Sequence, residues 1–398
     1  EAQWAMARRG DLAMRLYSMV FASDEVALRE WLSRGPLINA GEGRLTVRSI
    51  KVQADGALGS RTAWLHAPYT DAPDTSGVLT YDLDALSALI RDSREDNWQI
   101  NVHAIGDRAN SEVLAVFAPF TAANDDHRFR IEHAQHLRLG DGRLFAEQGV
   151  IASMQPIHLS SDRPWAIDRL GQKRIVEGAY IWRDLLDAGV IVASGTDAPV
   201  EPVDPIANFY AAVTRKTLKG VPETGFEPAQ KLSRMEALHA MTLAAAYAAF
   251  EEQAKGSIEV GKLADLTVLD QDLTTVPEAE ILNTEVLLTI VGGEVVYDAI
   301  PSDLVSLREE AENCVIDCVN SSGEATLSDH YSETLDWFFR RPRFYLNHLL
   351  GGDRSSAWVS KHIEEVRRYL SDSEQEYLNQ IAQLASAKST LDKQFSCQ

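Results

Sequence analysis

Short, continuously apolar segments alternate with amphipathic segments along much of the chain. Apolar segments of this kind, bounded by turn residues, are typical of strands that are buried on both faces. Because helical patterns lie between them, the sequence predicts an α/β fold in which a parallel sheet is covered by helices. We expect six strands, at residues 15–21, 45–52, 100–102, 128–131, 150–154 and 190–193.

The amphipathic segments predict where the helices lie. Ser23 is expected to cap a helix that ends near residue 35, with Asp24 and Glu25 in its first turn, where acidic side chains suit the helix dipole. Further helices are expected at residues 83–94, 108–117, 142–148, 181–188, 204–219 and 233–251, and loops at 66–80 and 157–180.

The pattern changes after the last of these helices. Residues 256–270 predict short strands around a turn, and residues 286–297 predict a hairpin with Gly292 and Gly293 at its tip. An apolar stripe near residues 356–384 predicts a long helix. We therefore expect three parts: a barrel portion at 1–255, a β-sandwich portion at 256–298, and a linker with a helical tail at 299–398.

Composition excludes several classes of protein. A net charge of −21 disfavours a nucleic-acid binder, which needs a basic surface. No apolar run approaches the roughly 18 residues of a membrane span, and the first residues lack the order of a secretory signal. The three cysteines, Cys314, Cys318 and Cys397, lie in the last quarter of the chain and form no disulfide framework. We expect a cytoplasmic protein with no nucleic-acid or membrane partner.

Metal-capable side chains follow four of the predicted strands. They are Lys51, His103, His133 and Asp197. A single histidine after an apolar segment is usually an ordinary core or loop residue, and a lysine there is often a solvated one. Since the carboxyl ends of parallel strands meet at one edge of the sheet, the repeated pattern favours a common site.

These residue types suggest hydrolysis assisted by a metal. Imidazole and carboxylate suit zinc and other divalent ions. Lysine is a ligand only after its amine has reacted with carbon dioxide to give an anionic carbamate. A metal lowers the pKa of its bound water, and a neighbouring aspartate can move the released proton. The set predicts attack of activated water on a carbonyl group.

Other residues have weaker cases. His158 could contact a substrate or be an ordinary loop histidine. His136 is expected to be supporting or structural. Asp55 and Arg61 are expected to be turn and pairing residues, and His239 to be structural.

Residues 45–298 resemble the amidohydrolase superfamily, in particular its amidohydrolase 3 (YtcJ-like) branch. The matching motifs, in order, are VKVQADGALGSRTA, NVHAIGDRA, RIEHAQ, SMQPIH, ASGTDAPV and GKLADLTVLD. The resemblance implies a metal-dependent (β/α)₈ TIM-like barrel joined to a small β-sandwich. It also implies that Lys51 is a carboxylated bridging lysine, that His103 and His133 are metal ligands, and that Asp197 is both ligand and proton shuttle.

The chain departs from the pattern of that family in one respect. It contains no His-x-His sequence, and its first histidine is His66. The six strands would then be strands three to eight of the barrel, which we expect to be incomplete and to lack the N-terminal His-x-His portion. Such a barrel has two open edges, so a homo-oligomer or a complementing partner chain is expected there.

The sequence thus predicts a hydrolase that uses a divalent metal, with zinc as the expected ion. Its expected substrate is a small amide or formamide, cleaved at a non-peptide carbon–nitrogen bond. The alternative is a catalytically inactive remnant that serves as a binding or assembly module.

Overall fold

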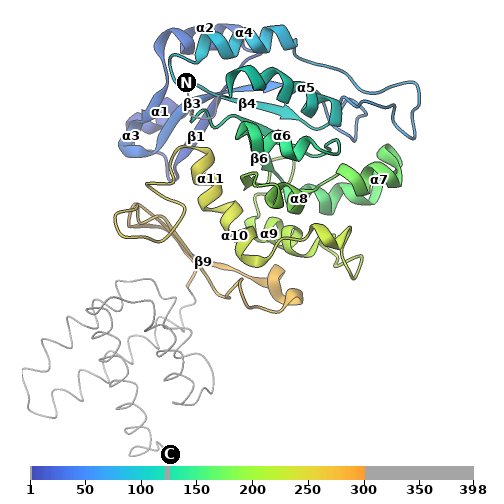
Figure 1. Cartoon of the computed structure of the whole chain (residues 1–398). Helices are drawn as coiled ribbons and strands as arrows, with labels where there is room; N and C mark the ends of the chain where they lie inside the picture. The colour runs from blue at the N-terminus through green and yellow to red at the C-terminus, as the bar shows by residue number, and fades with distance from the viewer. Residues whose placement is uncertain (1, 122–125, 301–398) are drawn as a thin grey trace, which may run out of the picture. The chain divides into compact units, whose positions relative to one another are not determined.

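The computed structural model describes residues 2–121 and 126–300 (Figure 1). The chain divides into two compact units, Glu1–Ala299 and Ile300–Gln398, and the description below concerns the first. The predicted linker and long helix, and all three cysteines, lie outside the described residues. No helix in the described part is long and apolar enough to cross a membrane.

Ten strands and eleven α-helices make up the described part. The strands are β1 (Leu16–Phe21), β2 (Leu37–Asn39), β3 (Leu45–Gln53), β4 (Gln99–Ala104), β5 (Arg130–His133), β6 (Ile151–Met154), β7 (Val192–Ser194), β8 (Leu266–Leu269), β9 (Val286–Val291) and β10 (Glu294–Asp298). The helices are α1 (Ala2–Arg9), α2 (Glu25–Arg34), α3 (Ala40–Gly43), α4 (Leu83–Ser93), α5 (Asp107–Phe117), α6 (Asp141–Gln148), α7 (Pro156–Gly178), α8 (Trp182–Asp187), α9 (Pro205–Thr214), α10 (Arg234–Met241) and α11 (Leu243–Ala248). Three short 3₁₀ helices are η1 (Ala118–Phe120), η2 (Pro228–Gln230) and η3 (Glu278–Asn283).

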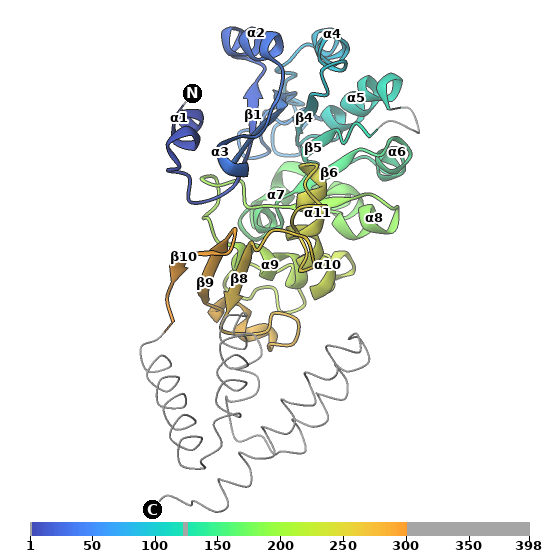
Figure 2. The same cartoon turned by 90° about the vertical axis from the view of Figure 1, so that its left-hand side faces the viewer.

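The main sheet is parallel and follows the order of the chain. Its hydrogen-bonded order is β1-β3-β4-β5-β6-β7, and β2 adds to β3 in the antiparallel direction. Each parallel strand pairs with the next one after a helical connection, and helices such as α4, α5 and α6 lie along the outside of the arc of strands (Figure 2). The predicted α/β fold is confirmed, with the six expected strands in a TIM-like arrangement whose two edge strands are β1 and β7.

Burial on both faces explains the apolar character of these strands. Ile50, Ile100, Val102 and Ile131 are all completely buried at the centre of the sheet. Gln99 is one of the polar exceptions, and its side-chain amide donates hydrogen bonds to two main-chain carbonyl groups at 2.6 and 2.8 Å. Buried polar groups are tolerated when they are paired in this way.

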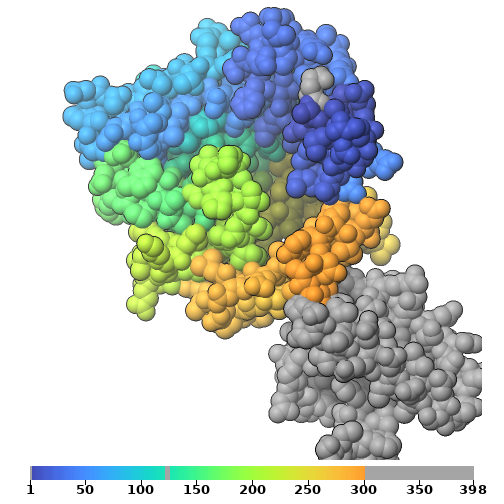
Figure 3. Space-filling view, turned by 180° about the vertical axis from the view of Figure 1, so that it is seen from behind, coloured from blue at the N-terminus to red at the C-terminus, as the bar shows by residue number. Residues whose placement is uncertain are grey.

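The small sheet is antiparallel, in the order β10-β9-β8. The predicted hairpin is confirmed: β9 and β10 are joined at Gly292 and Gly293, which both have the positive φ that such a turn needs. An ion pair of 2.6 Å between Arg15, just before β1, and Asp265, just before β8, connects this sheet to the main one. The sheet lies beside the segment around α9 (Figure 3).

Two local predictions were wrong. The cap of α2 is Asp24 instead of Ser23, because the Asp24 carboxylate accepts the Ala27 N–H at 3.0 Å. The segment predicted as a loop at 157–180 is mostly the helix α7. Pro164 within this helix, and Gly171 at a φ of 74°, interrupt the periodicity on which the prediction relied.

Two further helices are shorter than predicted. The helix expected at 204–219 ends at Thr214, where Arg215 adopts a left-handed conformation. The helix expected at 233–251 is divided at Thr242 into α10 and α11.

The start of α5 packs closely against the loop that follows β3. The carbonyl oxygen of Trp64 accepts hydrogen bonds from the N–H groups of Arg108 and Ala109, both at 3.2 Å. A Cβ atom on Gly106 would lie 2.1 Å from that oxygen. Glycine at this position therefore permits the contact between loop and helix.

We predict that Gly106→Ala lowers the free energy of unfolding by about 1–3 kcal/mol, since the methyl group would push the loop away from α5. Urea denaturation followed by circular dichroism measures the change. Gly142→Ala is the control, because its Cβ would meet Leu185 at an ordinary 3.5 Å. Equal stabilities of the two variants would contradict the prediction.

Candidate functional site

The carboxyl ends of strands β3 to β7 lie at one edge of the sheet. Lys51 lies near the end of β3, His103 near the end of β4, and His133 is the last residue of β5. Asp197 follows β7 after a short turn, and His158 lies in the first turn of α7, directly after β6. All five residues singled out in the sequence therefore lie at the same edge, as the parallel topology requires.

The two strand-end histidines face each other closely. The ring centroids of His103 and His133 are 4.5 Å apart. Nε2 of His103 lies 3.1 Å from the carbonyl oxygen of Gly56, and Nδ1 of His133 lies 2.7 Å from Oε1 of Gln155. Within the described residues this leaves Nδ1 of His103 and Nε2 of His133 without a hydrogen bond.

His158 and Asp197 extend this pair into a cluster. The rings of His158 and His133 are nearly parallel, with centroids 5.9 Å apart. Nε2 of His158 lies 3.9 Å from a carboxylate oxygen of Asp197 and has no hydrogen-bond partner in the described part of the chain. The structure thus brings His103, His133, His158 and Asp197 together in a continuous series.

Lys51 belongs to the same electrostatic environment. Burial lowers the pKa of its amine, and the nearby charges of Glu132 and Asp197 oppose that shift. The Glu132 carboxylate is held by Arg130 at 2.8 Å. Lys51 is half-buried, so it is not the solvated lysine that the sequence left open. It has no ion-pair partner within 4 Å among the described residues.

Burial favours the neutral form of the imidazoles of His133 and His158. It lowers the pKa of His133 well below the usual value, and the charges of His103, Lys51 and His158 lower it further. Burial also lowers the pKa of His158, although Asp197 acts in the opposite direction. Neutral imidazole is the form of histidine that binds metal ions.

Four residues with strained backbone lie at this edge. His133, Ala134, Tyr180 and Asp197 have positive φ values of 79°, 42°, 55° and 57°. Each non-glycine residue in this region costs on the order of 1–3 kcal/mol. Such residues cluster where a precise side-chain position matters, which supports a functional role for the edge.

Asp55 fixes the loops from which the site is built. Its buried carboxylate accepts the main-chain N–H groups of Trp64, Ile105 and Gly106 at 2.8, 3.0 and 2.8 Å. It also lies 3.4 Å from Nε2 of His103. Asp55 is therefore a turn residue, as predicted.

Arg61 is a pairing residue, as predicted. Its guanidinium binds the carboxylate of Asp71 at 2.9 Å in the loop after β3. It therefore stabilises the loop and, within the described residues, forms no hydrogen bond or ion pair with the histidine cluster.

Sequence reasoning missed part of the site. A narrow pocket beside the histidines, which leaves no room for a water molecule, is lined by His133, Gln135, Met154, Gln155, His158, Tyr180 and Trp182. Gln155 follows β6 directly, so its position at a strand end could have marked it as a candidate site residue. Gln135 and Tyr180 meet across 45 positions of the chain, a contact that no local pattern reveals.

His103 and His133 provide two of the donor atoms that a metal ion needs, but not a complete set. Among residues 2–121 and 126–300, no three or more His, Cys, Asp and Glu side chains stand close enough together to hold one. The free nitrogens of His103 and His133 are donors of the kind that zinc prefers. A further donor must then come from Lys51, which is not one of those four residue types, or from atoms outside the described residues.

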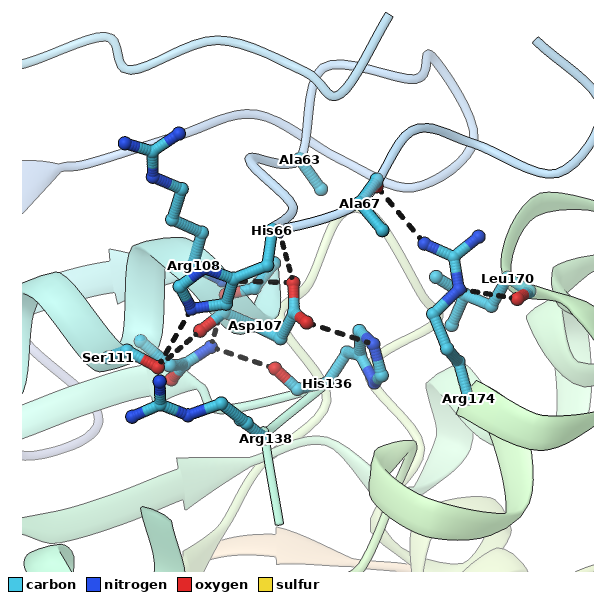
Figure 4. Close-up of polar contacts among 12 residues, drawn as sticks. Ala63, His66, Ala67, Asp107, Arg108, Ser111, His136, Arg138, Leu170 and Arg174 are labelled. Carbon is cyan, nitrogen blue, oxygen red and sulfur yellow. Dashed lines mark hydrogen bonds and ion pairs between the residues drawn. The ribbon is translucent and has the colours of Figure 1, made fainter. Parts of the chain in front are cut away.

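His136 belongs to a polar cluster that includes His66, Asp107 and Ser111 (Figure 4). Its buried ring has no hydrogen bond from either nitrogen in the described structure, and Nε2 lies 3.8 Å from the carboxylate of Asp107. The other Asp107 oxygen accepts the N–H groups of His66 and Arg108 at 3.0 Å. His136 thus faces the loop after β3 and not the histidine cluster, in agreement with its predicted supporting role.

We predict that His136 makes the protein less stable in acid. Burial lowers the pKa of His136 to about 4, whereas the unfolded chain binds this proton near pH 6.5. Stability therefore falls as the pH decreases through this interval, by up to about 1.4 kcal/mol per pH unit. The variant His136→Gln should flatten the dependence measured by urea denaturation.

The exposed His239 offers a matched control, because His239→Gln should keep the wild-type slope. A slope that is unchanged in His136→Gln would contradict the assignment.

Comparisons with known proteins agree with this arrangement. The family model described as "Amidohydrolase family" matches residues 3–297. "Putative amidohydrolase YtcJ" of Bacillus subtilis is 37% identical over 267 residues, which cover 66% of this chain and 48% of that protein. "Protein LONG AFTER FAR-RED 3" of Arabidopsis thaliana is 35% identical over 272 residues, 68% of this chain and 44% of that protein.

A third relative, "N-substituted formamide deformylase" of Arthrobacter pascens, is 31% identical over 199 residues, 50% of this chain and 36% of that protein. Among solved structures, an uncharacterized metal-dependent hydrolase from Pyrococcus horikoshii is similar with a TM-score of 0.62 and 31% identity. The match covers 70% of this chain and 55% of that one. The chain thus spans about half the length, or less, of the curated relatives it matches.

Proposed function

Because this chain belongs to the amidohydrolase family, we propose that it is a metal-dependent hydrolase of a small amide or formamide. The bond cleaved is a carbon–nitrogen bond other than a peptide bond. The observation that carries the proposal is the pair of imidazoles of His103 and His133, 4.5 Å apart, each with one nitrogen free of protein partners. The similarity to metal-dependent hydrolases of known structure supports it.

His103 and His133 would hold the ion together with Lys51, and zinc suits imidazole and anionic oxygen donors. When bound, such an ion supplies Lewis-acid activation of water and of the substrate carbonyl group. Lys51 would contribute as a carbamate, formed when its neutral amine adds carbon dioxide and releases one proton. Burial, which lowers the pKa of this amine, favours the neutral form that reacts.

The remaining residues would orient the reacting groups. Asp197 is partly exposed beside His158 and could take a proton from the attacking water and give it to the leaving nitrogen. Gln155 fixes the ring of His133 through its 2.7 Å contact at Nδ1, so that Nε2 points away from the protein partner. His158 would contact the substrate through its free nitrogen.

The proposed substrate class follows from the relatives. The Arthrobacter relative is named for the removal of formyl groups from substituted formamides. A small formamide is therefore the first substrate to test.

We predict that the purified full chain binds about one zinc ion and that His133→Gln weakens binding by at least about tenfold, since a ligand is lost. Metal analysis by mass spectrometry and calorimetric titration measure this. His239→Gln, at an exposed histidine, should bind as the wild type does. In an amide panel, Asp197→Asn should abolish turnover.

A chain without stoichiometric zinc, manganese or iron, whose turnover is unaffected by Asp197→Asn, would contradict the proposal. That result would favour the alternative of a non-catalytic binding or assembly module.

We also propose that the edge strands β1 and β7 accept complementing strands, because neither has a second neighbour in the described sheet. A second copy of this chain is the simplest source. Sedimentation velocity should then detect a dimer whose fraction rises with concentration. Phe21→Lys, at an exposed position of β1, should lower that fraction. A strict monomer at all concentrations would contradict this proposal.

A further inference from the structure

The first turn of α7 has no cap from its own cap residue. Pro156 opens the helix and has no N–H, so the first main-chain N–H that needs an acceptor is that of Ile157, next to His158. Gln155 occupies the cap position but makes no capping hydrogen bond. Its amide bonds Nδ1 of His133 at 2.7 Å and a main-chain carbonyl oxygen at 3.1 Å instead. The acceptor for this N–H must therefore come from another element.

Asn208 of α9 supplies that acceptor. Its Oδ1 accepts the N–H of Ile157 at 3.0 Å, and its Nδ2 donates to the hydroxyl oxygen of Ser194, the last residue of β7, at 2.8 Å. Since a main-chain N–H only donates, the first contact fixes which end of the amide faces which segment. One side chain thus bonds two segments at the site edge, one that carries His158 and one that leads to Asp197.

The surroundings of Asn208 hold its side chain in place. Asn208 is 1% exposed, and every residue of α9 from 206 to 212 is buried. The helix packs against α7, and it begins at a firm cap, where Asp204 accepts two main-chain N–H groups of the first turn at 2.9 and 3.1 Å. Both ends of this buried amide are hydrogen-bonded, and loss of either bond would leave a buried polar group without a partner.

His158 and Asp197 need such support because they do not bond each other. Nε2 of His158 lies 3.9 Å from a carboxylate oxygen of Asp197, which is beyond hydrogen-bond distance. Asp197 also has a left-handed backbone, which only the surrounding structure can impose. The segments that carry the two side chains therefore set their separation. A hydrogen bond from Ser161 to Glu201 joins the same segments, but at exposed positions.

We propose that Asn208 is a positioning residue that sets the placement of His158 relative to Asp197. It acts on His158 through the first turn of α7 and on Asp197 through Ser194. Because Asn208 caps α7, the amide of Gln155 remains available to the site. The chemical roles of the positioned residues rest on the proposed function, but their placement by Asn208 requires neither metal nor turnover.

The test follows the ring of His158 by NMR in the metal-free full chain, labelled with ¹³C in the histidine rings. His158→Gln identifies the signal, and a pH of about 9 keeps the imidazoles neutral, so that the signal reports on the surroundings of the ring. Asn208→Leu, which is similar in size but has no polar atom in its side chain, should shift the signal by several line widths, because the first turn of α7 loses its acceptor. Ser194→Ala should shift it less.

The placement of the two side chains is measured by combining substitutions. Asp197→Asn alone should shift the His158 signal, because a carboxylate oxygen lies 3.9 Å from its ring nitrogen. In the Asn208→Leu background the same substitution should shift it clearly less, since the two groups are no longer held at that separation. Asn208→Asp should restore the effect, because its carboxylate accepts both from the N–H of Ile157 and from the hydroxyl group of Ser194.

The control is Thr214→Val, which removes another buried polar group of α9, one whose hydroxyl bonds the main chain of Tyr210 and Lys216 instead. It should change neither the His158 signal nor its response to Asp197→Asn.

Circular dichroism verifies that each variant is folded. An unchanged response in Asn208→Leu, or an equal loss of response in Thr214→Val, would overturn the inference. If Asn208→Leu does not fold, Ser194→Ala takes its place, and an unchanged response there overturns the inference as well. The expected shifts in a chain that hydrolyses no amide would support the inference while the proposed function fails.

Discussion

The carboxylate of Asp55 is the interaction on which the rest of the site depends. It accepts three main-chain N–H groups that two loops would otherwise bury without partners, and each such group costs about 1–3 kcal/mol when unpaired. One side chain therefore joins the loop after β3 to the loop after β4. The carboxylate also contacts Nε2 of His103, so it helps to hold the ring that lies beside the neighbouring imidazole of His133.

This arrangement connects stability with chemistry. Trp64, held by Asp55, presents its carbonyl oxygen to the first turn of α5, and Gly106 leaves room for it. The helix in turn begins with Asp107, which binds the main chain of His66. The position of His103 is therefore set by a series of hydrogen bonds that reaches well beyond the histidine itself.

The strands could be predicted from the sequence because burial on both faces leaves a clear apolar run, as at Val190 to Ala193. The candidate residues at the strand ends could be predicted for the same reason, since a parallel sheet brings its carboxyl ends to one edge. The helix α7 could not, because Pro164 and Gly171 disrupt its period while tertiary contacts maintain it. The pocket wall could not either, because Gln135 and Tyr180 have no local signature and meet only in the folded chain.

The broken helix α7 has a consequence for how this fold can vary. Its first turn carries His158 at the pocket, while its residues near the break bind the loop after β3. The carbonyl of Arg169 accepts the N–H of Thr70, and Arg174 donates to the Thr70 hydroxyl at 3.0 Å. A change of length or sequence in that loop is therefore expected to move α7, and with it the side chain of His158. Loop and helix are expected to co-vary among relatives and to be inherited as a single module.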